Sequence, residues 1–101
     1  MTTIEALRAA RARIDTPEKW WKFEWPFNPG LASLDMAIEQ VCNDSGQFLF
    51  GPLTKKVRTS LIAQLPDRFS SLILFNDHPS TTHADVLALF DRAIAQEEDK
   101  S

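Results

Sequence analysis

The strongest structural signal in the sequence is the segment THADVLALFDRAI, residues 82–94. Its apolar residues recur three and four positions apart, which is the spacing of one face of an α-helix. They are Val86, Leu89, Phe90, Ala93 and Ile94. Thr82 followed by Asp85 is similar to a capping box, with Asp in place of the usual Glu. We therefore predict a helix that begins at this point and packs its apolar face against a core.

Six prolines divide the rest of the chain into segments with readable spacing. Apolar residues recur at helical spacing in residues 4–14, 31–44 and 54–65, and we predict a helix in each segment. Residues 70–75 fit a buried helix or a buried strand, and we favour the helix. The fold class is therefore a mainly α, compact single domain of four to five helices.

The ends of these helices are also marked in the sequence. Thr2 or Thr3 is suited to cap the first helix, and Thr54 the third, because Thr side chains accept hydrogen bonds from free backbone N–H groups. The last helix ends in acidic residues, and the helix dipole disfavours negative charge at that end. We expect a single globular domain over residues 1–101 with frayed ends at residues 1–3 and 97–101.

An unusual aromatic segment, WWKFEWPF, occupies residues 20–27. Four of its aromatic residues alternate with charged residues or proline, and this period of two favours an extended chain over a helix. They are Trp21, Phe23, Trp25 and Phe27. We expect these four to face the core. Trp20 falls outside the alternation, and we predict it to be exposed beside Lys22 and to contact a partner, because tryptophan is enriched in binding hot spots.

Composition and charge exclude several classes of protein. With 101 residues, 44% hydrophobic and 25% charged, the chain has the material for one packed domain. Its net charge of −3 argues against a dedicated nucleic-acid binder. There is no apolar stretch of membrane-spanning length, so no membrane partner is expected. The N-terminus is not a secretory signal and there is one cysteine, so a cytoplasmic location is the default.

Residues 74–90, LFNDHPSTTHADVLALF, resemble the C-terminal motif of a small domain-of-unknown-function family, 6197, of actinobacteria and phages. That motif has an aromatic residue, Asn-Asp, a proline two residues on, Thr, and a helix near a Val-Leu pair. The similarity lies mainly over residues 74–94, and residues 10–21 are loosely similar to the family's N-terminal helix and tryptophan. Residues 33–37 depart from the family's Cys-Leu-Gly-Ala helix. The resemblance implies a compact helical fold and brings no activity with it.

The same motif holds the densest polar cluster of the chain. Two imidazoles, His78 and His83, lie near Asp77 and Asp85, and such groups are able to bind a metal or to serve as acid and base. Their spacing matches none of the common metal signatures, and turn and cap roles explain the same residues. Cys42 lies on the apolar face of its helix, where we expect a core role. We predict no catalytic residue, no metal site and no cofactor.

Two basic groups are candidates for binding. Lys55, Lys56 and Arg58 lie near the start of the predicted third helix, the end at which the dipole disfavours positive charge, and we predict that they contact a partner. A solvated helix face is the alternative explanation, and it is the usual one for such a run. The other group, on the N-terminal helix, consists of Arg8, Arg11 and Arg13. Together with the tryptophans, the two groups suggest single-stranded nucleic acid as an alternative ligand.

These observations lead to three functional hypotheses. The first is a small non-enzymatic protein-binding module, by analogy with the family a phage-associated regulator or inhibitor of a host system. Its partner is another protein or a second copy, since so small a chain can complete its core in a homodimer. The second is a nucleic-acid-associated protein that uses the basic helix faces. The third is a metal-dependent hydrolase that uses His78 and His83.

Overall fold

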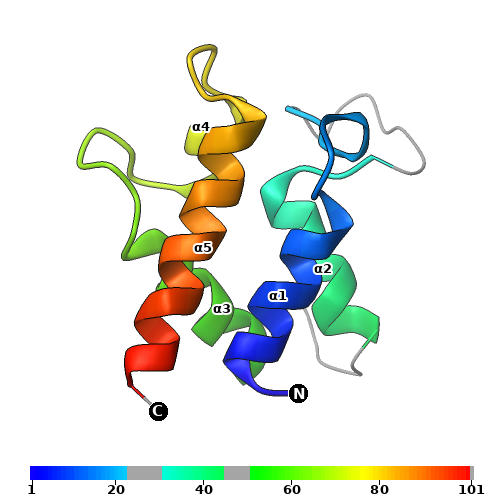
Figure 1. Cartoon of the computed structure of the whole chain (residues 1–101), viewed down its shortest axis with the longest axis vertical. Helices are drawn as coiled ribbons and strands as arrows, with labels where there is room; N and C mark the ends of the chain where they lie inside the picture. Colours follow the sequence, from blue (N-terminus) through cyan, green and yellow to red (C-terminus); the bar gives the residue numbers. More distant parts are fainter. Residues whose placement is uncertain (23–30, 45–50, 101) are drawn as a thin grey trace.

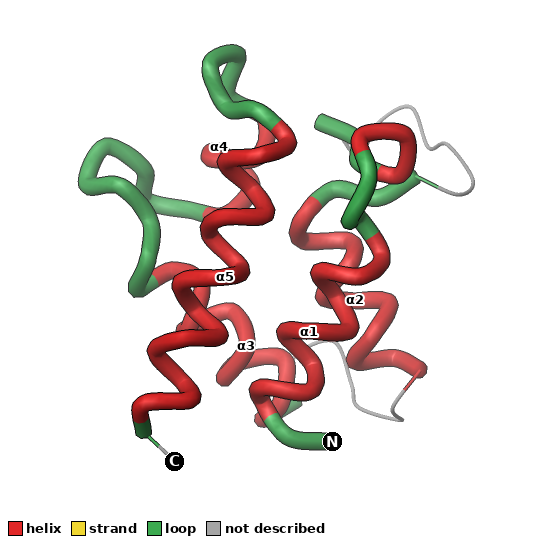
Figure 2. The backbone as a smooth tube through the Cα atoms, viewed as in Figure 1, coloured by secondary structure: helices red, strands yellow, loops and turns green. Residues whose placement is uncertain are grey.

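The computed structural model describes residues 1–22, 31–44 and 51–100 of the chain. Within these ranges the regular elements are helices, as the sequence predicts (Figure 2). They are α1 (Thr3–Arg13), the 3₁₀ turn η1 (Pro17–Lys19), α2 (Leu34–Asp44), α3 (Pro52–Ile62), α4 (Leu72–Asp77) and α5 (His83–Asp99). The mainly α fold is confirmed.

Two capping boxes fix where α1 and α5 begin. Thr2 Oγ1 accepts from the Glu5 N–H at 3.1 Å, and the Glu5 carboxylate accepts from the Thr2 N–H at 2.9 Å. Thr82 and Asp85 make the same reciprocal pair at 3.1 and 2.9 Å. Each box pairs two backbone N–H groups that the first helical turn leaves free. Both predicted helix starts are therefore confirmed, with Thr2 as the cap of α1.

The start of α3 differs from the prediction. The helix begins at Pro52 with Gly51 as N-cap, and Thr54 is fully buried inside its first turn. Proline suits the first helical position because its φ angle is already helical and its missing N–H would have had no partner there. The prediction of Thr54 as the N-cap was wrong. It rested on the capping ability of the Thr54 hydroxyl and overlooked the preference of Pro52 for the first helical position.

Helix α4 settles the ambiguity at residues 70–75. Ser71 Oγ accepts from the Leu74 N–H at 3.1 Å and caps the helix. Leu72 and Phe75, three positions apart, are buried, whereas Ile73 and Leu74 are about half exposed. The preferred helix is confirmed, but the apolar run is buried only on one side.

The helices enclose one core. Figure 1 shows α1 and α5 side by side and antiparallel, with both chain ends at the same end of the molecule. Helix α1 also packs against α2, while α3 contacts α1, α2 and α5. The largest side chains sealed from solvent come from four helices and the turn after α1, and they include Leu7, Ile14, Leu34, Ile38, Leu61, Leu89 and Phe90. One contiguous cluster unites them.

Helix α5 runs to Asp99, and the fraying expected for residues 97–101 stays a prediction. A tertiary contact holds its last turn, because Ser60 Oγ of α3 donates a hydrogen bond to the Glu97 carboxylate. Lys100 adds an ion pair to the same carboxylate at 3.4 Å. These contacts offset the unfavourable charge at the helix C-terminus.

The chain leaves η1 in an extended conformation at Trp20. Trp20 has φ −94° and ψ 138°. The Trp21 N–H donates to the Ala32 carbonyl and the Ala32 N–H to the Lys19 carbonyl, both at 3.0 Å. The predicted inward-facing residues Phe23, Trp25 and Phe27 lie outside the described residues.

Candidate functional site

A buried asparagine organises the end of the molecule opposite the chain ends. The Asn76 side chain, 1% exposed, accepts hydrogen bonds at Oδ1 from Trp20 Nε1 at 2.7 Å and from the Leu34 N–H at 3.1 Å. Its Nδ2 donates to the carbonyls of Lys22 at 2.7 Å and Trp21 at 3.2 Å. One amide thus ties the segment after η1 and the start of α2 to α4. Its donors and acceptors are satisfied, which is the condition for burying a polar side chain.

The position of Trp20 corrects the sequence analysis. Its indole is half-buried against the core rather than exposed, because its Nε1–H donates to the buried Asn76 amide. Lys22 lies beside it, with Nζ 5.1 Å from the indole centroid. The same ammonium donates to the carbonyls of His78 at 2.6 Å and Thr81 at 2.5 Å. Both residues therefore have structural roles here, and their predicted contact with a partner stays a prediction.

The two histidines hold turns in place. His83 Nε2 lies 2.6 Å from the Ile14 carbonyl, and since a carbonyl only accepts, this nitrogen carries the proton. His78 Nδ1 accepts from the Ser80 N–H at 3.1 Å. Within the described ranges, no group of three His, Cys, Asp or Glu side chains is placed to hold a metal ion. Cys42 is buried in the core at 1% exposure.

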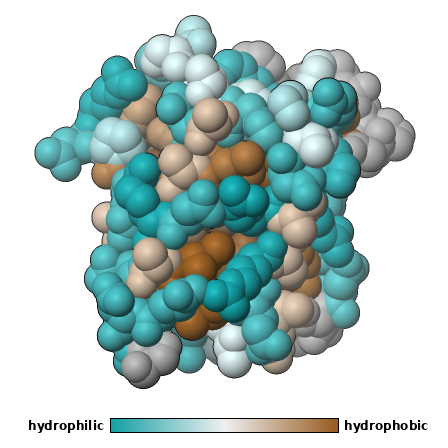
Figure 3. Space-filling view, in the orientation of Figure 1, coloured by the Kyte–Doolittle hydropathy of each residue, from teal (hydrophilic) through white to brown (hydrophobic). Residues whose placement is uncertain are grey.

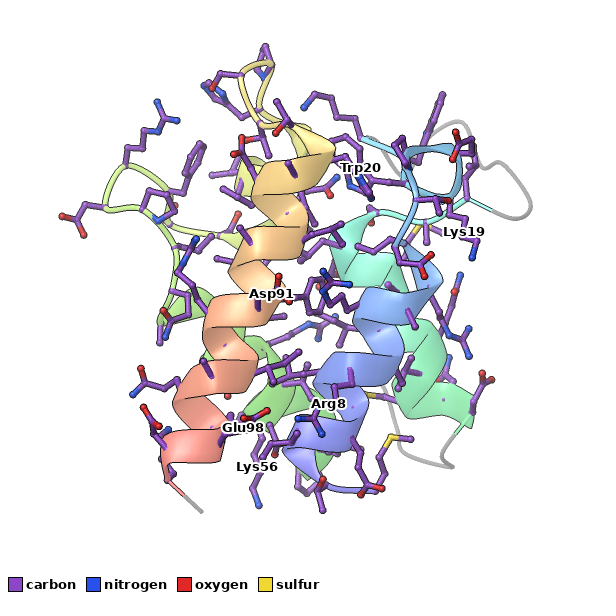
Figure 4. The ribbon with its side chains drawn as sticks, in the orientation of Figure 1. Arg8, Lys19, Trp20, Lys56, Asp91 and Glu98 are labelled. Carbon is purple, nitrogen blue, oxygen red and sulfur yellow. The ribbon has the colours of Figure 1, made fainter. Side chains whose placement is uncertain are left out.

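The predicted partner-binding residues do not form one surface. Figure 4 shows Trp20 at one end of the molecule and Lys56 at the other, below the ends of α1 and α5. Lys55 lies with Lys56 along a hollow between α3 and α5. Arg58 lies on another side, where its guanidinium forms two hydrogen bonds to Asp35 at 3.1 and 3.2 Å. Lys55, Lys56 and Arg58 are close in sequence, but Arg58 lies apart from the two lysines in the structure. With Trp20, the predicted residues occupy three separate places.

Arg58 borders an apolar groove that the sequence analysis missed. The groove, about 390 Å³ in volume, runs across α2, α3 and α4. It is lined by Asp35, Glu39, Arg58, Ile62, Ser70, Ser71, Leu72 and Ile73. Ile62 and Ile73 are 47% and 48% exposed, and Leu74, the next residue of α4, is 57% exposed. The sequence contained one indication of this groove, the run of four apolar residues in α4. Such a run does not by itself show which of its side chains are buried and which are exposed.

The basic group of α1 is paired with acids. Arg11 Nε lies 2.7 Å from Asp91 Oδ1 of α5, and Figure 4 shows Arg8 and Glu98 pointing toward one another between the same helices. Arg13 pairs with Asp44 at the end of α2. Figure 3 shows that the face of α1 and α5 is largely hydrophilic, with short hydrophobic stretches between the polar side chains. These arginines therefore connect helices, and their charge is balanced locally.

The carboxyl groups of Glu97 and Glu5 have pKa values below the ordinary value. The hydrogen bond from Ser60 lowers the pKa of Glu97 below its ordinary value of 4.5, Lys100 lowers it further, and burial opposes both. In the capping box, hydrogen bonds from Thr2 lower the pKa of Glu5 in the same way. Both shifts follow from contacts that hold helix ends, so neither marks a catalytic group.

Comparison with known proteins assigns the chain to a family. The model of the family of unknown function DUF6197 matches residues 1–96. The chain belongs to this family. The resemblance seen in residues 74–94 is thus confirmed, and the DUF6197 match extends it over nearly the whole chain. The structure gives the Asn-Asp element of that motif a physical role, because Asn76 is the amide that joins three segments of the fold.

Other comparisons add no activity. No curated protein and no solved structure matches this DUF6197 chain. Among the described residues, no helix combines the length and the apolar character needed to cross a membrane.

Proposed function

We propose that this DUF6197 protein is a small non-enzymatic protein-binding module and that its binding face is the apolar groove of α2, α3 and α4. The observation that carries the proposal is the grouping of exposed apolar side chains along this groove. Ile62 and Ile73 line it, and Leu74 follows on α4, each with about half of its surface in water. Contiguous exposed apolar surface on a small protein marks an interaction site.

A second copy of the chain is the proposed partner. A two-fold contact needs a face that carries both a recess and a projection, because the same patch serves both copies. The groove is the recess, and we propose as the projection the exposed Leu74, which follows the lining residue Ile73 in α4. The rim also carries both signs of charge, Arg58 against Asp35 and Glu39, so the face is complementary in charge to itself.

The dimer is expected to be weak. Burying the half of Ile62, Ile73 and Leu74 that is still exposed contributes about 1 kcal/mol for each side chain. Six such side chains in a symmetric dimer contribute about 6 kcal/mol before the cost of association is subtracted. We therefore expect a weak dimer, with a dissociation constant between about 100 μM and about 1 mM.

The structural roles of the histidines and the cysteine support a binding protein rather than an enzyme. Both imidazoles are engaged with backbone groups of turns, and the one cysteine is in the core. A binding module acts by occupying a surface of its partner, which is how a small regulator or inhibitor works. We propose the cytoplasm as the place of this binding, since a sequence with one cysteine cannot form an internal disulfide.

Sedimentation equilibrium of the wild type and two variants tests the proposal, over a range from about 1 μM to about 1 mM. Leu74→Asp places a charge on the proposed interface. Ala95→Asp places the same charge at an exposed position of α5, away from the groove. Since both positions are exposed, the helix content of both variants, measured by circular dichroism, is expected to equal that of the wild type.

The expected result is a dimer at high concentration for the wild type and Ala95→Asp, and a monomer throughout for Leu74→Asp. A wild type that is monomeric over the whole range would overturn the second copy as partner. A dimer that tolerates Leu74→Asp would show that copies associate through a different face, which equally contradicts the proposal.

A further inference from the structure

A second hollow lies at the end of the molecule that carries both termini. It has a volume of about 570 Å³ and is lined mainly by residues of α3 and α5. It is lined by Thr3, Lys55, Lys56, Thr59, Ser60, Ala63, Gln64, Gln96, Glu97 and Lys100. Volumes of this size are typical of small-molecule sites. It shares no lining residue with the apolar groove.

The charge of this hollow is positive in an otherwise acidic chain. Three lysines and one glutamate line it, which leaves +2 against −3 for the whole protein. Lys100 pairs with Glu97 at 3.4 Å. The side chains of Lys55 and Lys56 are exposed, and neither forms an ion pair with any residue in the described ranges. Two uncompensated ammonium groups thus face the same opening.

These lysines are also placed against the helix dipole. They lie in the first half of α3, where the partial positive charge of the helix N-terminus repels them. The arginines of α1 and Arg58 differ from these lysines, since each of them is paired with a carboxylate. An anion bound in the hollow would balance the positive charge of both lysines.

The chemistry of the lining narrows the class of anion. Lysine is a point-charge binder of phosphate, and the hydroxyls of Thr3 and Thr59 together with the amides of Gln64 and Gln96 are suited to bind phosphate and hydroxyl oxygens. No aromatic side chain is found among the described lining residues, so there is no platform on which a nucleobase would stack. We propose that this hollow binds a small, non-aromatic phosphorylated molecule, with its phosphate groups at Lys55 and Lys56.

Titration with inorganic tripolyphosphate, followed by amide chemical shifts and by calorimetry, tests this site. The double variant Lys55→Gln/Lys56→Gln removes the proposed phosphate contacts. Lys19→Gln is a control that removes one charge elsewhere, because Lys19 is an exposed lysine at the opposite end of the molecule (Figure 4). Both positions of the double variant are exposed, so the fold is expected to persist and the shifts of the remaining amides will show it.

We expect saturable binding with shifts confined to the lining of the hollow, weakened at least about tenfold in the double variant and unchanged in Lys19→Gln. Shifts spread over the whole surface, or an equal loss in Lys19→Gln, would overturn the site. A hexaglutamate peptide forms the second arm of the experiment. If it binds as tightly as tripolyphosphate and depends on the same lysines, the ligand is an acidic peptide and the phosphate assignment is wrong.

Discussion

Trp20 and Trp21 are neighbours in sequence but have different hydrogen-bonding environments. Trp20 Nε1 donates to the buried Asn76 amide at 2.7 Å. Trp21 Nε1 is also shielded from solvent, yet it finds no acceptor within the described part of the chain. A hydrogen bond lost in the interior costs more than the removal of a donor that has none. The pair therefore allows the contribution of one hydrogen bond to be measured within a single dipeptide.

We predict that Trp20→Phe lowers the free energy of unfolding by about 1 kcal/mol more than Trp21→Phe does. Both substitutions remove the same ring and the same N–H, so the loss of volume largely cancels in the comparison. Urea unfolding followed by far-UV circular dichroism measures the difference. Equal losses in the two variants would show that the bond to Asn76 does not stabilise the fold.

A second residue-scale prediction concerns Glu97 and pH. Its pKa in the folded protein lies below 4.5, chiefly because of the Ser60 hydroxyl, so its contribution to stability is present above the unfolded pKa. That contribution is lost as the pH falls through the lower, folded pKa. Ser60→Ala raises the folded pKa toward 4.5 and removes most of this dependence.

The expected result is a stability gap between wild type and Ser60→Ala that is present near neutral pH and shrinks in acid. Urea unfolding at about pH 7 and about pH 3, with an NMR titration of the Glu97 carboxyl, measures it. Thr59→Ala, at the exposed neighbouring position, is the control and should show no such pH dependence. A gap of constant size at both pH values contradicts the assignment.

At the scale of elements, two bidentate ion pairs join helices in different environments. Arg58 joins α3 to α2 through Asp35, and these two side chains are 23% and 11% exposed. Arg11 joins α1 to α5 through Asp91, with side chains 32% and 58% exposed. Removing one partner of a buried pair leaves a desolvated charge, whereas the exposed partner returns to water.

We predict that Arg58→Ala lowers the free energy of unfolding by about 2–3 kcal/mol, because it strands the Asp35 carboxylate. Arg11→Ala should cost less than about 1 kcal/mol. Urea unfolding of both variants measures the two losses. High salt should reduce the effect of Arg11→Ala more than that of Arg58→Ala. If Arg11→Ala lowers the free energy of unfolding more than Arg58→Ala does, burial does not determine how much these ion pairs contribute to stability.

The elements also show how far local sequence information reaches. The starts of α1 and α5 were predictable because each capping box lies within four residues of chain. The end of α5 was not, because it depends on Ser60, which is 37 residues away in sequence. The preference for a helix over a strand at α4 was right, while its outward apolar side required knowledge of what packs against it.

At the scale of the whole molecule, the single core predicts one cooperative transition. The buried residues of α1, α2, α3 and α5 form one cluster, and Asn76 attaches the segment after η1 to the same unit. We expect the NMR signal of the Trp20 indole N–H to disappear at the same urea concentration as the helical circular dichroism. Loss of that signal at a lower concentration would show that the segment opens independently of the bundle.

The sequence by itself determined the mainly α class, the family motif and the starts of α1 and α5. These follow from apolar spacing and capping residues, which act between positions three or four apart. Tertiary structure alone decided that Trp20 is half-buried, since its partner Asn76 lies 56 residues away. It also separated Arg58 from Lys55 and Lys56 and brought Lys100 beside them. Sites are formed by side chains that meet across helices, and the spacing within one helix does not specify which helix packs beside it.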